Sequence, residues 1–119
     1  MPKTIKELLK EHSRYVESKG RQGTRLTTVL LNSVQWDKSK DLYEANLQFA
    51  SLRGADLTRA NLQGADLGWA TLGGAKLQGA NLFMANLEGA ELFSAYFFDA
   101  RMTDEQKDYV LRRGAIINE

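Results

Sequence analysis

Few side chains in this sequence are of the types that perform catalysis or hold metal ions. His12 is the only histidine, and the chain contains no cysteine. A metal centre needs several nitrogen, sulfur or carboxylate ligands close together, so a lone histidine without thiolates predicts none. Because His12 falls on the apolar stripe of a predicted helix, we interpret it as a boundary residue of that helix.

The remaining candidates for chemistry are two acids and a glycine-rich stretch. Asp56 and Asp66 occupy a position at which the repeat motif generally favours Asp and Asn, which indicates solvated or backbone-bonding carboxylates rather than an acid–base pair. The segment LGGAK at residues 72–76 lacks the spacing and the Ser or Thr of a phosphate-binding loop. With no nucleophile, base and orienting group together, we expect no catalytic residues, no cofactor and no enzyme activity.

Composition indicates one ordinary globular domain. The 119 residues carry a net charge of +1, with 43% hydrophobic and 26% charged residues, which argues against a polyanion-binding or a strongly acidic protein. The first twenty residues are charged throughout, unlike a signal peptide, and the longest aliphatic run, at 29–31, is too short to span a bilayer. We therefore expect a cytoplasmic protein without membrane insertion.

The dominant pattern is a repeat of five residues. Alanine recurs at every fifth position from Ala45 to Ala100, twelve times in succession, and leucine follows two residues later except at Phe97 and Met102. Five matches neither the helical nor the strand period. Five extended residues span about 16 Å, which suits one side of a polygon. Four sides would close a square coil of twenty residues, with leucine and alanine inside and glycine (54, 64, 74, 79 and 89) at the corners.

Capping signals flank the repeat. Thr4 with Glu7, and Thr103 with Gln106, have the spacing of helix capping boxes. Apolar residues on these helices would cover the open ends of the coil; they are Ile5, Leu8, Leu9, Tyr15 and Val16 at one end and Val110, Leu111, Ile116 and Ile117 at the other. The predicted single domain comprises a capping helix (1–20), an irregular first coil (21–39), the repeat (40–102), and a second capping helix with a tail (103–119).

The motif A-(D/N)-L-x-x appears here as ADLTR, ANLQG, ADLGW, ANLFM and ANLEG, and it resembles that of the pentapeptide repeat proteins. The resemblance implies an all-β solenoid, a right-handed quadrilateral β-helix of about 3–4 coils with N- and C-terminal α-helical caps. Plain members of this family are abundant in cyanobacteria, which makes such an origin an expectation for this chain.

With the interior filled, the outward side chains become the candidate site. We predict that a protein partner binds through Tyr43, Phe49, Trp69, Phe83 and Met84. The alternative is that the terminal segments cover some of these residues. Phe93, Tyr96 and Phe98, in the last coil, are expected beneath the C-terminal helix.

The predicted function is therefore a non-enzymatic β-helical interaction module, a regulatory or assembly factor that is a monomer or an end-to-end or face-to-face dimer. The alternative from the family is a DNA mimic that protects DNA gyrase or topoisomerase. Residues 40–102 carry seven acids and five bases, whereas a duplex has one charge per about 1.7 Å, so the charge is too balanced. Residues 1–39, with eight bases and four acids, give only weak support for nucleic-acid binding.

Overall fold

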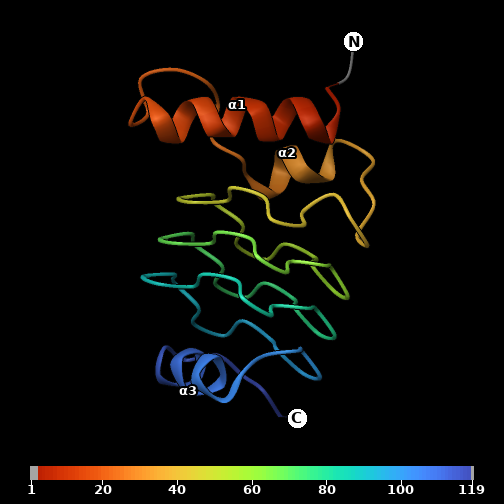
Figure 1. The fold of residues 1–119 in the computed structure, drawn as a ribbon, viewed down its shortest axis with the longest axis vertical. Helices are drawn as coiled ribbons and strands as arrows, with labels where there is room; N and C mark the ends of the chain where they lie inside the picture. The colour runs from red at the N-terminus through yellow and green to blue at the C-terminus, as the bar shows by residue number, and fades with distance from the viewer. Residues whose placement is uncertain (1–2, 119) are drawn as a thin grey trace.

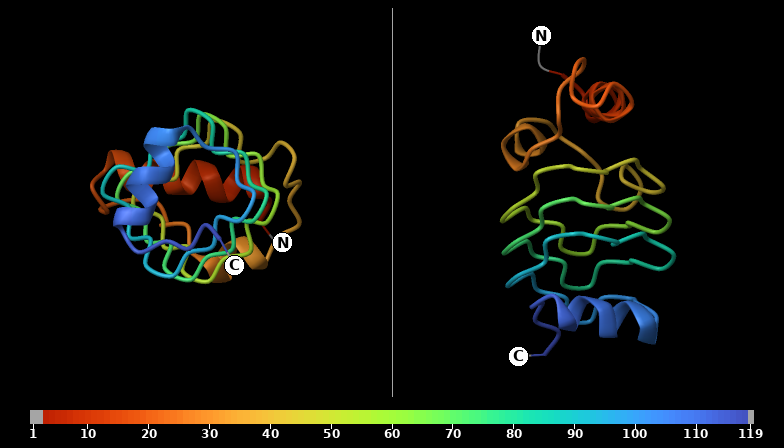
Figure 2. Two further views of the ribbon diagram at one scale, coloured as in Figure 1. Left: turned by 90° about the horizontal axis from the view of Figure 1, so that it is seen from below. Right: turned by 90° about the vertical axis from the view of Figure 1, so that its left-hand side faces the viewer.

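The computed structural model describes residues 3–118 and contains three helices among them: α1 (Ile5–Glu17), α2 (Thr28–Asn32) and α3 (Asp104–Arg112). The chain between α2 and α3 winds into stacked turns, with α1 and α2 at one end of the stack and α3 at the other (Figure 1). Viewed along the stack, the turns superpose in a four-cornered outline, and helices lie across both ends (Figure 2).

Backbone hydrogen bonds join each turn to the next at a spacing of about twenty residues. Asp66 pairs in parallel with Asn46 above it and with Asn86 below it. Its N–H donates to Ala45 O at 2.9 Å, while Leu67 N–H donates to Asn86 O at 2.8 Å. These bridges are isolated, and residues 3–118 form no longer strand, because a corner every five residues leaves little chain to extend between turns. Parallel bridges therefore join the turns without a conventional sheet among the described residues, and the all-β solenoid stays a prediction.

Each corner of the coil is a tight turn whose third residue has a positive φ. Ala50 N–H donates to Leu47 O at 3.1 Å, and Phe49 between them has φ 63°. The glycines predicted at corners have this conformation, as a type II turn requires. The repeat's Asp and Asn side chains complete the corners: Asp66 Oδ1, for example, accepts the Gly68 N–H at 3.0 Å. From Asn46 onward, the same bond forms wherever the second motif position is Asp or Asn, at residues 46, 56, 61, 66, 81 and 86.

The interior is apolar and closely filled. The leucines of the repeat from Leu42 to Leu82 and the alanines from Ala50 to Ala80 have 0% exposed surface. Burying one leucine contributes about 1.5–3 kcal/mol, so the columns of identical side chains supply most of the stabilisation. Beside each leucine, alanine leaves no room for a larger side chain without overpacking. Leucine and alanine side chains therefore fill the described interior of the repeat.

At the N-terminal end, α1 and α2 cover the first turn. The Thr4–Glu7 capping box is present, and α1 buries Ile5 and Leu8. Helix α2, within the segment predicted as an irregular coil, was not foreseen. Thr27 pairs with Ser51, which lies 24 residues later instead of twenty, and the four extra residues are about one turn of helix.

At the C-terminal end, α3 replaces the hydrogen bonds that a further turn would make. The Gln106 side chain donates to Ala85 O at 3.2 Å, and Arg113 Nε donates to Ala90 O at 2.8 Å. Equivalent carbonyls higher in the stack accept backbone N–H groups from the next turn. Helix α3 therefore satisfies the polar edge of the last coil as well as covering its apolar interior.

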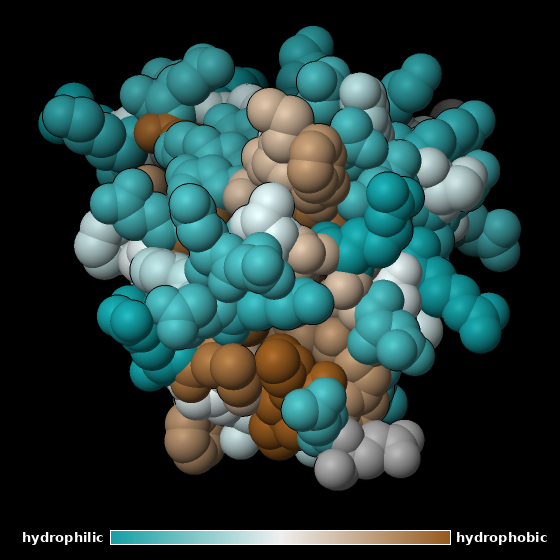
Figure 3. All heavy atoms as spheres, turned by 60° about the horizontal axis from the view of Figure 1, so that its bottom comes forward, coloured by the Kyte–Doolittle hydropathy of each residue, from teal (hydrophilic) through white to brown (hydrophobic). Residues whose placement is uncertain are grey.

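Two side chains at the C-terminal end are more exposed than the sequence predicts. Leu111 was expected to seal this end, and Phe93 was expected beneath the C-terminal helix. Val110 is buried, but the next residue, Leu111, is 48% exposed because it points to another side of α3. Phe93 is 70% exposed, since it belongs to a corner and projects outward. These two predictions are wrong. In Figure 3, with this end turned forward, hydrophobic side chains gather in the lower part of the visible face, and hydrophilic side chains cover most of the rest of that face.

Candidate functional site

His12 is fully buried and ties α1 to the first turn. Its Nδ1 accepts the Leu26 N–H at 2.8 Å, so its proton lies on Nε2, which donates to Gln48 O at 2.8 Å. Burial lowers the pKa of His12 from 6.5, and the nearby Arg25 charge lowers it further, while the bond to Gln48 acts in the opposite direction. His12 is therefore a neutral structural group with both nitrogens occupied, which refines its interpretation as a boundary residue.

The two acids do not form an acid–base pair. Asp56 and Asp66 are ten residues apart, half of a twenty-residue turn, and so lie on opposite sides of the coil. Hydrogen bonds from Thr58 lower the pKa of Asp56 to about 2, and Lys38 Nζ lies 3.2 Å from its carboxylate. Within residues 3–118, His, Asp and Glu side chains nowhere gather in threes that could hold a metal ion.

The glycines of residues 72–76 have structural explanations. Gly74 is a corner with φ 68°. A Cβ on Gly73 would come within 2.8 Å of the Glu91 carboxylate, which accepts the Gly73 N–H at 3.2 Å. Arg53 also pairs with Glu91, at 3.4 Å. A carboxylate of this chain therefore occupies the space beside Gly73.

The five predicted partner-binding residues all reach solvent, with the exposed fractions Tyr43 46%, Phe49 47%, Trp69 60%, Phe83 46% and Met84 72%. They lie on two adjacent corners of the coil. Phe49 and Trp69 share one, and the other three share the next. The side between these corners carries a polar ladder in which Gln48 and Asn86 both donate to Asp66. The structure thus brings together two apolar groups flanking a polar strip, and their binding role stays a prediction.

Trp69 is exposed but held in place from below. Its indole lies so close to Gly89 that a Cβ there would approach ring atoms to 2.4 Å. Gly89 in turn donates its N–H to the Tyr109 hydroxyl at 2.8 Å, which links this corner to α3. Trp69 therefore rests on the turn below while 60% of its surface stays exposed to solvent.

The sequence did not predict a groove that lies beside Phe49. It has a volume of about 260 Å³ and is lined by Tyr15, Val16, Lys19, Gly20 and Phe49. The sequence predicted Tyr15 and Val16 as sealing residues, but in the structure both are only half-buried. One feature of the sequence could have indicated this exposure. Tyr15 and Val16 lie near the end of the predicted helix, and the last turn of a helix that lies across a coil can extend past the edge of the coil.

Comparison with known proteins gives a family match over the repeat. Residues 41–79 and 72–104 match the family model described as pentapeptide repeats, with 8 copies. Among curated proteins, none matches the chain. The crystal structure of alr5209, a pentapeptide repeat protein from Nostoc Pcc 7120, aligns with 24% identity over 99% of each chain and a TM-score of 0.35. Among residues 3–118, there is no helix with the length and apolar character needed to cross a membrane.

Proposed function

Because the chain belongs to the pentapeptide repeat family, we propose that it is a non-catalytic module that binds a partner protein through the outer wall of its coils. Proteins of this family are generally non-enzymatic interaction modules. The filled interior supports the same view, since only outward side chains can contact another molecule. In this proposal the protein acts in the cytoplasm as a regulatory or assembly factor.

Family membership also supports the finer description of the coil as a right-handed quadrilateral β-helix of about 3–4 turns. The parallel bridges between residues twenty apart are consistent with it. Such a coil presents each corner as a column of side chains, so residues from successive turns can contact one partner together.

The observation that carries the proposal is the residue type at the corners. A positive φ costs a residue other than glycine about 1–2 kcal/mol. Phe49, Trp69 and Met84 nevertheless have φ of 63°, 60° and 62°, and their apolar side chains stay 47% to 72% exposed. Backbone conformation disfavours large apolar residues at these places, and packing on the neighbouring turn buries them only in part, whereas a surface for a partner accounts for their exposed area.

Replacing Trp69 by glycine tests the proposal. Glycine relieves the backbone at φ 60°, which offsets the lost contact with Gly89, so we expect a nearly unchanged melting temperature. Arg59→Gly is the matched control, because Arg59 also has φ 60° and is polar. The measurement is the recovery of partner proteins with each tagged variant from the native host.

We expect Trp69→Gly to lose a partner that the wild-type protein and Arg59→Gly both retain. Equal recovery of the partner by the wild-type protein and both variants would show that Trp69 is not part of the binding surface. A collapse of the melting temperature for Trp69→Gly alone would show that the indole is needed for packing, and the argument from exposed corners would fail.

A further inference from the structure

We propose that the groove between the end of α1 and Phe49 receives a single large apolar side chain from an acidic segment of the partner protein. This inference rests on the proposed function, and it specifies where the partner is anchored and the chemistry of the segment that binds. The groove lies beside the corner shared by Phe49 and Trp69, so an anchored segment can continue along that corner.

The size and lining of the groove suit one side chain. Its volume of about 260 Å³ is below the range of about 300–1,000 Å³ typical of pockets for whole small molecules. Tyr15, Val16 and Phe49 supply apolar walls. The Tyr15 ring is fixed by stacking on His12, with ring centroids 6.1 Å apart, and it lies against Gly20. An aromatic or aliphatic side chain would displace water from these surfaces without requiring them to move.

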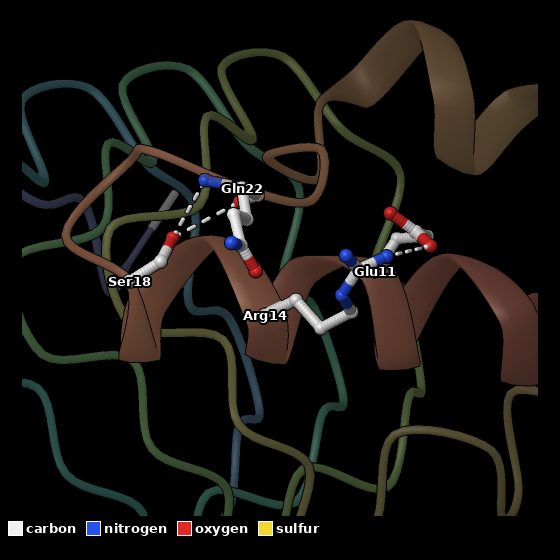
Figure 4. A network of polar contacts seen from close by, with 4 residues as sticks. All are labelled: Glu11, Arg14, Ser18 and Gln22. Atoms are coloured by element: carbon white, nitrogen blue, oxygen red, sulfur yellow. Dashed lines mark hydrogen bonds and ion pairs between the residues drawn. The ribbon is translucent and has the colours of Figure 1, made fainter.

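Hydrogen bonds and close packing hold the loop that follows α1 against the helix, so this side of the groove is formed without a partner. The Ser18 hydroxyl donates to Gln22 O at 3.1 Å and accepts the Gln22 N–H at 2.8 Å (Figure 4). Gly23 packs directly on α1, since a Cβ there would lie 2.3 Å from Glu11 O. A preformed site avoids part of the ordering cost that weakens flexible binding surfaces.

Charge around the groove favours an acidic partner. Lys19, Arg21 and Arg25 are exposed on or beside this loop, and Glu17 is the one acidic residue between positions 15 and 36. Among the residues that the structure describes, none of these three cations has a carboxylate within ion-pair distance; Arg25 instead lies over the Tyr15 ring at 5.9 Å. Carboxylates on either side of the partner's apolar side chain could therefore pair with these cations.

The test uses the peptide Glu-Glu-Phe-Glu-Glu, capped at both ends, titrated into the isotope-labelled protein at low ionic strength. We expect amide NMR shifts to concentrate at residues 15–20 and at Phe49. The peptides Gln-Gln-Phe-Gln-Gln and Glu-Glu-Ala-Glu-Glu should both bind more weakly, because one lacks the charges and the other lacks the anchor. No binding, shifts elsewhere, or equal binding of all three peptides would overturn the inference.

Two variants locate the site. Lys19→Glu should weaken peptide binding by about fivefold or more, since it replaces an attraction with a repulsion. Phe49→Gly should weaken it as well while leaving the fold intact, because glycine accepts φ 63°. Lys76→Glu and Arg59→Gly are the matched controls on other parts of the wall, and neither should change binding. Equal affinity of Lys19→Glu and wild type would contradict the proposed charge recognition.

Recovery of the native partner by these variants distinguishes a failure of this inference from a failure of the proposed function. If partner recovery depends on Trp69 but survives both Lys19→Glu and Phe49→Gly, the interaction surface stands and the groove is not part of it. If recovery survives Trp69→Gly as well, the proposed function itself fails.

Discussion

His12 and the repeat's Asp and Asn residues use side-chain hydrogen bonds to satisfy backbone groups that adjoining turns leave free. The sequence predicts that His12 lies on the covered face of a helix, and the structure agrees. Its two partners, Leu26 and Gln48, are 14 and 36 residues away, so no local pattern could identify them. The Asp and Asn residues that make these bonds all fall at the second position of the five-residue motif, and their backbone-bonding role could be anticipated.

The buried, neutral His12 predicts a stability that depends on pH. Burial lowers its pKa in the folded protein, so below 6.5 the unfolded chain binds a proton that the folded chain does not. The free energy of unfolding should therefore fall as the pH drops below 6.5, towards the folded-state pKa. Urea unfolding at neutral and mildly acidic pH measures the effect.

His12→Gln is the control for this prediction, because a glutamine can donate and accept a hydrogen bond but does not titrate. The variant should lose the part of the pH dependence that His12 contributes. His12→Ala should destabilise the protein by about 1–3 kcal/mol for each buried group left unpaired. The same acid-dependent loss in His12→Gln and wild type would show that other groups cause it.

The sequence predicts where the corners of the coil lie, but it does not predict how the side chains at the corners pack. Regular spacing identified every glycine corner, and the same count places Phe49, Trp69 and Met84 at corners. What spacing cannot show is how a corner side chain packs on the turn below, as the Trp69 indole does on Gly89. That contact joins residues from separate turns and depends on the side-chain conformation.

Two glycine substitutions separate backbone strain from this packing. Gly74→Ala should cost about 1–2 kcal/mol, because it forces a positive φ on alanine although no atom lies within 4 Å of the new Cβ. Gly89→Ala has a similar φ of 72° but must also displace the Trp69 indole. It should be the more destabilising of the two in chemical denaturation.

Gly54→Ala provides a second reference, since space around Gly54 is also open. It should match Gly74→Ala. If Gly89→Ala costs no more than these two, the indole does not rest on Gly89 in solution, and Trp69 is more mobile than the structure shows.

At the scale of the whole molecule, the five-residue repeat is enough to predict stacked turns with an apolar interior. Capping boxes likewise predicted α1 and α3. Helix α2 could not be predicted, because the need for it arises from the 24-residue separation of Thr27 and Ser51. The groove depends on residues 15–20 meeting Phe49, which only the complete fold brings about. Sequence therefore indicated which residues face outward, but not the groove that residues 15–20 form with Phe49.

The orientation of the leucines decides where this protein can bind anything, and the cysteine-free sequence allows a direct test. Single cysteines at Leu57 and Leu77, both 0% exposed, are compared with cysteines at their exposed neighbours Asp56 and Lys76. The measurement is the rate of maleimide labelling in the folded protein. We predict rapid labelling at positions 56 and 76 and none at 57 and 77 until the chain is unfolded by denaturant. Equal labelling of all four positions in the folded state would contradict an interior filled by leucine.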